Sequence, residues 1–89
     1  MIYYESKVEK ALKKGDIPMN IFKNIHNAFS ALDLTNDFNL FDIRKMTGNY
    51  TREYYRLRKD KYRAIFYVSE HDFHVIFIGK REEVYDLWQ

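Results

Sequence analysis

In the first half of the chain, apolar residues recur every three or four positions, which is the spacing of amphipathic helices. The widest such stripe contains Ile17, Ile21, Phe22, Ile25, Phe29 and Leu32. A shorter helix precedes it, because Ser6 and Glu9 have the spacing of a capping box and Gly15 can end the helix. Pro18 suits the first turn of the second helix. The sequence therefore predicts a short strand at residues 2–4 followed by a helical hairpin.

After a polar loop at residues 33–39, apolar residues recur at every second position, as they do in strands. The alternation predicts strands at residues 40–46, 53–59, 62–69 and 73–79. A turn at Thr47-Gly48-Asn49 and a short helix at residues 81–88 complete the chain. We therefore expect a single α+β domain over residues 1–89. Its N-terminal strand and helical hairpin pack on a mainly antiparallel sheet of about four strands, and a short helix ends it.

The stretch from Tyr54 to Val68 predicts a β-hairpin that turns at Asp60-Lys61. With a second turn at Glu70-His71, the expected cross-strand pairs are Lys59 with Tyr62, Arg58 with Arg63, Arg56 with Ile65, Tyr67 with His74, Ile65 with Ile76, and Arg63 with Ile78. One face is then apolar and packs on the helices: Tyr55, Leu57, Ala64, Phe66, Val68, Phe73, Val75 and Phe77. The other face mixes cations and aromatic rings around an aliphatic floor: Tyr54, Arg56, Arg58, Arg63, Ile65, Tyr67, His74, Ile76, Ile78 and Lys80.

Positive charge is concentrated in this part of the chain, although the net charge is only +2. Residues 44–63 contain eight Lys or Arg against Glu53 and Asp60, a net charge of +6, whereas residues 1–43 and 64–89 have net charges of −1 and −3. Such a patch attracts polyanions or an acidic protein. The sequence has no cysteine, which fits a reducing compartment, and no run approaching the roughly 18 apolar residues of a membrane span. We therefore expect a cytoplasmic protein.

Two sets of residues resemble motifs of the RelE/ParE toxin superfamily. Tyr55-Arg56-Leu57-Arg58 followed by Tyr62-Arg63 is similar to the "YRIR…YR" core of the superfamily. Ile78-Gly79-Lys80-Arg81 followed by Val84-Tyr85 is similar to the "GKR…VY" ending of its RelE branch, and Lys45-Met46-Thr47-Gly48 stands in the place of an "LKG" turn. Known members of this branch are toxins of toxin–antitoxin operons that cut mRNA in the ribosomal A site without a metal.

The resemblance implies a role for each matching residue. Arg63 would stabilise the charge that develops on the scissile phosphate, and Arg81 would assist it or the leaving oxygen. Tyr85 would stack on a base or take part in proton transfer, while Arg56 and Arg58 would hold the RNA. The resemblance also implies a cognate antitoxin in a hetero-oligomer, mRNA on the ribosome as substrate, and no cofactor. Because they lie on the predicted cationic face, Tyr54, His74 and Lys80 are further candidates for substrate binding.

The sequence does not decide which residue accepts the proton of the attacking 2′-hydroxyl. Some members have lysines where Tyr54 and Arg56 stand here, and arginine is a poor base because it stays protonated. The candidates are Tyr85, His74 and Tyr54. The intrinsic pKa of His74 is the best suited, whereas Tyr85 has the precedent of the family. His71 and His74 lack further ligands at a recognised spacing, so we predict no metal site.

Two other functions are compatible with this sequence. A ParE-like toxin would poison DNA gyrase by binding it, with no ribonuclease chemistry, and a decayed member would bind only its antitoxin. Arg56, Arg58 and Arg63 could then form only a solvated strand face or an antitoxin-docking patch. The "GKR…VY" ending favours the nuclease.

Overall fold

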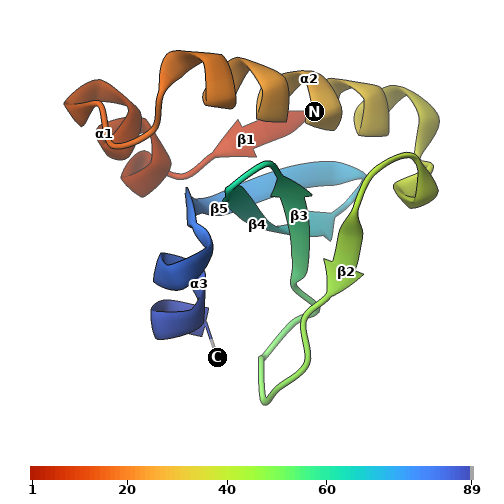
Figure 1. Cartoon of the computed structure of the whole chain (residues 1–89). Coiled ribbons are helices and arrows are strands. Elements are labelled where there is room, and N and C mark those ends of the chain that lie inside the picture. Colours follow the sequence, from red (N-terminus) through yellow and green to blue (C-terminus); the bar gives the residue numbers. More distant parts are fainter. Residues whose placement is uncertain (89) are drawn as a thin grey trace.

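The computed structural model describes the backbone of residues 1–88 and the side chains of residues 1–84. The elements follow in the order β1 (Ile2–Tyr4), α1 (Ser6–Lys14), α2 (Met19–Thr35), the 3₁₀ turn η1 (Phe38–Leu40), β2 (Ile43–Lys45), β3 (Tyr55–Lys59), β4 (Tyr62–Ser69), β5 (Asp72–Lys80) and α3 (Arg81–Trp88). In Figure 1, α1 and α2 lie over one face of the sheet and α3 lies on the other side. The predicted α+β class, with its helical hairpin and its C-terminal helix, is confirmed.

Within residues 1–88, five strands form one sheet in the order β1-β5-β4-β3-β2. β1 runs parallel to β5, and the other neighbouring strands are antiparallel. The expected sheet of about four strands thus gains the N-terminal strand as a fifth, parallel member at one edge. Because α1 starts directly after β1, the chain passes at once from the sheet edge to the helical layer (Figure 1).

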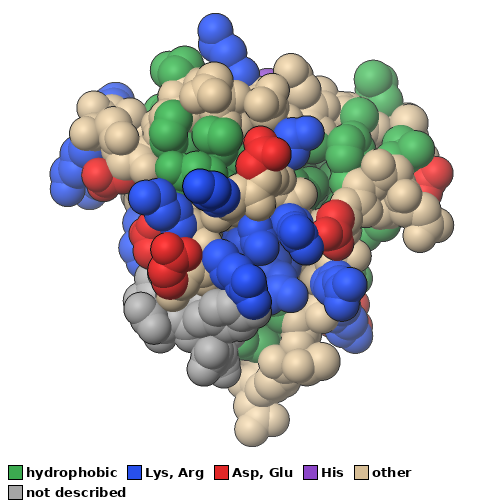
Figure 2. All heavy atoms as spheres, in the orientation of Figure 1, with side chains coloured by type: hydrophobic (Ala, Val, Ile, Leu, Met, Phe, Trp, Pro, Cys, Tyr) green, Lys and Arg blue, Asp and Glu red, His purple; other side chains and the backbone are tan. Residues whose placement is uncertain are grey.

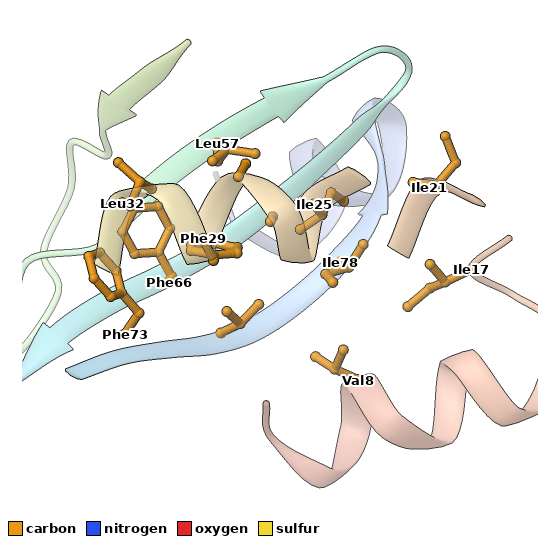
Figure 3. Close-up of a cluster of buried hydrophobic side chains, with 13 residues drawn as sticks. Val8, Ile17, Ile21, Ile25, Phe29, Leu32, Leu57, Phe66, Phe73 and Ile78 are labelled. Carbon is orange, nitrogen blue, oxygen red and sulfur yellow. The ribbon is translucent and has the colours of Figure 1, made fainter. Parts of the chain in front are cut away.

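The hydrophobic core lies between α2 and the sheet. Ile25, Phe29 and Leu32 of α2 have 0% exposed surface, as does Phe66 of β4. The rings of Phe29 and Phe66 meet edge to face, with their centroids 5.0 Å apart, and Phe73 completes the cluster (Figure 3). Each such buried side chain stabilises the fold by about 1.5–3 kcal/mol. The apolar stripe predicted for the second helix is therefore the feature that fixes which face of the sheet is covered.

The predicted start of the first helix is wrong. Within the described residues, Glu5 is the N-cap and has no side-chain capping bond, so Ser6 is already the first residue of α1. The backbone N–H of Glu5 donates to the carbonyl of Val75 at 3.0 Å, which extends the strand conformation to that residue. The predicted stop at Gly15 is confirmed, since Gly15 has a left-handed φ of 82° at the C-cap.

Two predicted strands are longer than the observed ones. The expected strand at residues 40–46 is reduced to β2, because residues 38–40 form η1 and the Asp37 carboxylate accepts a hydrogen bond from the N–H of Asn39 at 3.0 Å. This local bond competes with the sheet for the backbone. β3 begins at Tyr55 rather than at residue 53.

The register of the β3–β4 hairpin is as predicted, but that of β4 with β5 changes at a β-bulge. Arg58 lies opposite Arg63, and Tyr67 lies opposite His74. Between Ile65 and Phe66 the register shifts, so that Ile65 pairs with Phe77 and not with Ile76. The bulge leaves one extra residue in β5.

The bulge also exchanges side chains between the two faces. Ile78 joins the buried cluster under the helices, whereas Phe77 joins a second cluster with Ile65, Ile76 and Val84 of α3. The prediction had placed Ile78 and Phe77 the other way round. We call the face with the second cluster the open face of the sheet. None of the described helices is both long enough and apolar enough to cross a membrane.

Candidate functional site

Five arginines meet at one end of the open face. A pocket of about 240 Å³ is lined by six described residues: Asp42, Arg44, Arg56, Arg58, Arg63 and Arg81. We call its arginines the arginine cluster. Figure 2 shows Lys and Arg side chains gathered between α3 and β2, in front of β3 and β4. This juxtaposition concentrates positive charge at one end of the open face.

The sheet brings these arginines together by register. Arg44 of β2 lies opposite Arg56 of β3, and Arg58 of β3 lies opposite Arg63 of β4. Two directly opposed pairs of like charges destabilise a sheet. Asp42 offsets part of the repulsion, because its carboxylate oxygens lie 3.7 Å from Nη1 of Arg58 and 3.9 Å from Nε of Arg44. The cluster therefore keeps a strong excess of positive charge.

Arg63 is the most enclosed member, with only 8% of its surface exposed. Its Nη1 donates to the carbonyl oxygens of Asp60 at 3.1 Å and of Tyr62 at 3.0 Å. Its cross-strand partner is Gly79, a consequence of the bulge that the sequence did not reveal. The guanidinium is thus held by the backbone of the β3–β4 turn and has a neighbour without a side chain.

Arg81 reaches the pocket from the first residue of α3. Its backbone N–H donates to the carbonyl of Lys61 at 3.2 Å, which ties the start of α3 to the same turn. The helix start is also stabilised by Glu83, whose Oε1 accepts from the N–H of Lys80 at 3.1 Å. The side chain of Tyr85, the third residue in the predicted catalytic set, lies outside the described part of the structure.

Two of the remaining predicted candidates, His74 and Tyr54, lie elsewhere on the open face. His74 is stacked between Tyr3 and Tyr67, with ring centroids 5.2 Å and 4.7 Å away, and Cζ of Arg52 sits 4.0 Å from the centre of the Tyr67 ring. We call these four residues the aromatic ladder. Tyr54 packs against Tyr67, with ring centroids 6.0 Å apart.

The arginine cluster and the aromatic ladder are separated along the strands. Arg63 and Tyr67 are four residues apart in β4, which corresponds to about 13 Å. Neither Tyr54 nor His74 is among the described residues that line the arginine pocket. The predicted place of Lys80 on the open face is wrong, because the bulge pairs it with Tyr62 on the side of the helices. Lys80 still lines a hollow with Arg63 and Arg81 and a second one beside α1.

Arg44 is a member of the cluster that the sequence-based prediction did not select as a site residue. The signal was present, because Arg44 belongs to the cationic segment and lies two residues before the Met46 of the turn motif. The strand predicted at residues 40–46, which contains Arg44, is longer than the observed β2, and the sequence assigns it no register with the next strand. Because Arg44 lies opposite Arg56, its side chain is on the same face of the sheet as that of Arg56, as the alternation along β2 requires.

Near the ladder end, but on the face that packs on the helices, Lys45, Glu53 and Tyr55 have clearly shifted pKa values. A hydrogen bond from Nζ of Lys45, at 2.9 Å, lowers the pKa of the Glu53 carboxyl and raises that of the Lys45 amine. Burial raises the pKa of Tyr55, whose hydroxyl donates to Glu53 at 3.3 Å. Among the described side chains, no group of three or more His, Asp or Glu residues is arranged to hold a metal ion.

What the arginine cluster can do follows from its chemistry. Guanidinium groups remain charged at all physiological pH values, and their fork of N–H donors matches the oxygens of a phosphate. Such donors, held in place before the reaction, stabilise negative charge that develops in a transition state. The pocket is therefore suited to a phosphate group rather than to a neutral ligand.

No protein-family model matches the chain, and no curated protein matches it significantly by sequence. Among solved structures, a chain of the RelB–RelE antitoxin–toxin complex from Methanococcus jannaschii is 26% identical, with a TM-score of 0.75 over 98% of this chain and 99% of that one. A chain of the archaeal RelE–RelB complex from Pyrococcus horikoshii OT3 has a TM-score of 0.69 at 22% identity, over 90% of this chain and 92% of that one.

Fold and site together define a small α+β protein that carries an arginine-lined pocket on the face opposite its helical hairpin. Both similar structures are complexes of RelE with RelB, the first of them described as an antitoxin–toxin complex, and the likeness extends over 98% and 90% of this chain. The resemblance to the RelE/ParE toxin superfamily that the sequence motifs indicated is thereby confirmed.

Proposed function

We propose that this protein is the toxin of a type II toxin–antitoxin system and that it cleaves mRNA in the ribosomal A site. The observation that carries the proposal is the arginine cluster, which gathers Arg56, Arg58, Arg63 and Arg81 around one pocket in a RelE-like fold. These are the cationic residues that the sequence motifs assign to phosphate stabilisation and RNA binding. The ribosome supplies the mRNA in a single-stranded form, and a cytoplasmic location follows from that substrate.

The proposed reaction needs no group beyond the RNA and the protein. The 2′-oxygen of a ribose attacks the adjacent phosphorus, the bond from phosphorus to the 5′-oxygen breaks, and a 2′,3′-cyclic phosphate and a 5′-hydroxyl result. The phosphate gains negative charge on the way, and Arg63 and Arg81 stabilise it. Arg56 and Arg58 bind the flanking phosphates, so that the attacking oxygen is aligned with the leaving oxygen.

Two protons must also move, from the 2′-hydroxyl to a base and from an acid to the 5′-oxygen. The arginines cannot accept the first proton, because they stay protonated. Tyr85, four residues after Arg81 in α3, is the candidate that the family resemblance supplies for base stacking or proton transfer. His74 is a poor candidate for the base, because its ring is stacked on both sides about 13 Å along the sheet from Arg63.

We also propose a cognate antitoxin as the regulatory partner. The two similar structures are complexes of a RelE protein with RelB. An acidic antitoxin segment laid over the arginine cluster would satisfy its excess charge and block the pocket. The resting form is then a toxin–antitoxin hetero-oligomer, and release of the antitoxin exposes the site.

The decisive experiment replaces Arg63 and Arg81 by Ala, singly and together, and measures cleavage of mRNA on programmed ribosomes. Removing one preorganised donor to a transition state costs about 100- to 1,000-fold in rate. Arg52→Ala is the matched control, because it removes the same charge from the ladder end of the open face. Thermal unfolding of each variant shows whether the fold is kept. Full growth arrest by the Arg63→Ala/Arg81→Ala protein would exclude the proposal.

The same purified protein distinguishes the two alternatives. Inhibition of gyrase supercoiling without mRNA cleavage would assign it to the ParE-like mode. A protein that binds its antitoxin tightly, leaves growth unaffected and cleaves no mRNA would be a decayed member of the superfamily.

A further inference from the structure

The turn between β3 and β4 is connected to both arginines that the proposed function places at the scissile phosphate. Nη1 of Arg63 donates to the carbonyl of Asp60 at 3.1 Å and to that of Tyr62 at 3.0 Å. The backbone N–H of Arg81 donates to the carbonyl of Lys61 at 3.2 Å. Three consecutive carbonyl groups of one turn therefore accept hydrogen bonds from these two residues.

The backbone conformation of Asp60 sets the direction of its carbonyl. Asp60 has a φ of 54°, which lies in the left-handed region. Glycine, asparagine and aspartate adopt this region readily, whereas a β-branched residue avoids it because its Cβ crowds the carbonyl. A residue that forces Asp60 out of this region also turns its carbonyl away from Arg63.

The surroundings of Arg63 leave it few other positions. Its side chain is 8% exposed. The residue opposite Arg63 is Gly79, where an added Cβ would lie 2.7 Å from the ring of Phe77. The Phe77 ring thus occupies the space that the missing side chain of Gly79 leaves beside Arg63, and the turn carbonyls hold the Nη1 end of Arg63.

We propose that the β3–β4 turn is a positioning element for phosphate chemistry and that Asp60 is its positioning residue, acting through its backbone carbonyl on Arg63. The proposal rests on the proposed function, because it concerns how the same arginine is held. The bond from the Arg81 N–H to Lys61 supports the turn from the side of α3. A guanidinium fixed before substrate arrives needs no reorganisation during the reaction, which is the condition for strong transition-state stabilisation.

Three substitutions at one position separate the carbonyl from the side chain. Asp60→Asn removes the carboxylate charge and Asp60→Gly removes the side chain, yet both keep the left-handed backbone. Asp60→Val disfavours that backbone. We expect the Asn and Gly variants to cleave ribosome-bound mRNA within about threefold of the wild-type rate. Asp60→Val should lower the rate at saturating ribosome concentration by about 10- to 100-fold and change KM little, because a donor to the transition state is misplaced.

A double-mutant cycle tests whether Asp60 acts through Arg63. In an Arg63→Ala background, Asp60→Val should lower the residual rate by less than about threefold, because the group it positions is already absent. An equal loss in both backgrounds would overturn the proposal, since Asp60→Val would then act through general damage to the fold. A loss in Asp60→Asn as large as that in Asp60→Val would also overturn it, because the carboxylate would be the active group.

A measurement independent of cleavage keeps this proposal separate from the proposed function. In the free wild-type protein and in Asp60→Gly, the guanidinium protons of Arg63 should exchange slowly and give resolved NMR signals. These signals should be absent in Asp60→Val. Persistent signals in Asp60→Val would overturn the positioning role. A wild-type protein that shows these signals but cleaves no mRNA would overturn the proposed function and leave the geometry of the turn supported.

Discussion

At one end of the open face, five arginines and Asp42 line a pocket, whereas at the other end His74 and Tyr67 stack in a ladder. Strand β4 takes part in both ends, because it carries Arg63 and Tyr67, whereas the other arginines come from β2, β3 and α3. At the ladder end the rings fill the space with contacts to one another, and the exposed Lys45 and Glu53 form an ion pair. At the arginine end the like charges lie opposite each other across the strands.

The difference shows that side chains at the two ends of one sheet face can have opposite effects on stability. Stacked rings stabilise the protein by themselves, by about 0.5–1.5 kcal/mol for each pair beyond the burial of their area. Opposed arginines do the reverse, and this local cost is the usual mark of a site arranged for a ligand. We accordingly interpret the ladder as a structural feature of the sheet and propose the arginine cluster as the functional site.

Within this comparison, the largest effects are expected from substituting one residue at each end. Arg56→Ala should lower the cleavage rate by about 10- to 100-fold, because it removes a charged donor to the RNA, and it should leave the unfolding free energy nearly unchanged. Tyr67→Ala should do the opposite, with a loss of about 1–2 kcal/mol in stability and cleavage within about twofold of wild type. Urea unfolding and ribosome-bound mRNA cleavage measure the two effects. Strong loss of cleavage in a well-folded Tyr67→Ala protein would show that the ends are not separate.

The second prediction concerns Gly79, which lies opposite Arg63 at the arginine end. An alanine Cβ there would approach the Phe77 ring to 2.7 Å, and that ring is packed with Ile65 and Val84. Overpacking of this kind costs about 1–3 kcal/mol. Gly79→Ala should therefore lower the unfolding free energy by that amount in urea. Gly15→Ala is a useful contrast, because a Cβ at Gly15 meets no atom within 4 Å and is disfavoured only by the φ of 82°.

Much of this architecture could be predicted from the sequence because its signals are strong there. The stripe of α2 and the alternation of β3 fix which residues face the core, and the Asp60-Lys61 turn fixes the pairing of Arg58 with Arg63. The bulge could not be predicted. Ile76, Phe77 and Ile78 are all apolar, so either face accepts any of them and the pattern does not mark the extra residue.

For a related reason, the sequence predicts which face holds the candidate site but not which residues of that face lie together. Alternation assigns a side chain to a face and says nothing about neighbours along the strand, so His74 and Tyr54 were grouped with the arginines on one face. The structure places both at the ladder end. The contacts of Arg63 with the turn carbonyls also escape such patterns, because they depend on backbone directions and not on residue type.

A third prediction uses the repulsion within the arginine cluster. Arg44→Thr removes one of two like charges that oppose each other and loses only an exposed contact with Asp42 at 3.9 Å. The unfolding free energy should rise by about 0.2–0.5 kcal/mol at low salt. This gain should shrink as added salt shortens the screening length from about 30 Å to about 3 Å. Lys45→Thr is the matched control, because it removes the neighbouring charge but breaks the pair with Glu53, and it should give no gain.

The smallest expected effect is a pH dependence confined to the ladder end. The hydrogen bond from Lys45 lowers the pKa of Glu53, so the pair stabilises the protein above the ordinary glutamate pKa of about 4.3 and loses this contribution as the pH falls through the lowered value. The raised pKa of Lys45 keeps its contribution below about pH 10.4 and loses it only above that range. The stability difference between wild type and Glu53→Gln should therefore be constant from about pH 6 to 9 and vanish in acid.

The corresponding variant at the arginine end sharpens the contrast. Arg56→Gln changes a group that does not titrate, so its effect on the unfolding free energy should have no pH-dependent step of its own between about pH 3 and 9. Denaturant titrations at a series of pH values measure both variants. An acid step in Glu53→Gln and none in Arg56→Gln would show that a carboxylate pair stabilises the protein at Glu53 and not at Arg56. An acid step in Arg56→Gln would mean that a carboxylate, such as the Asp42 that already pairs with Arg58 and Arg44, also stabilises Arg56.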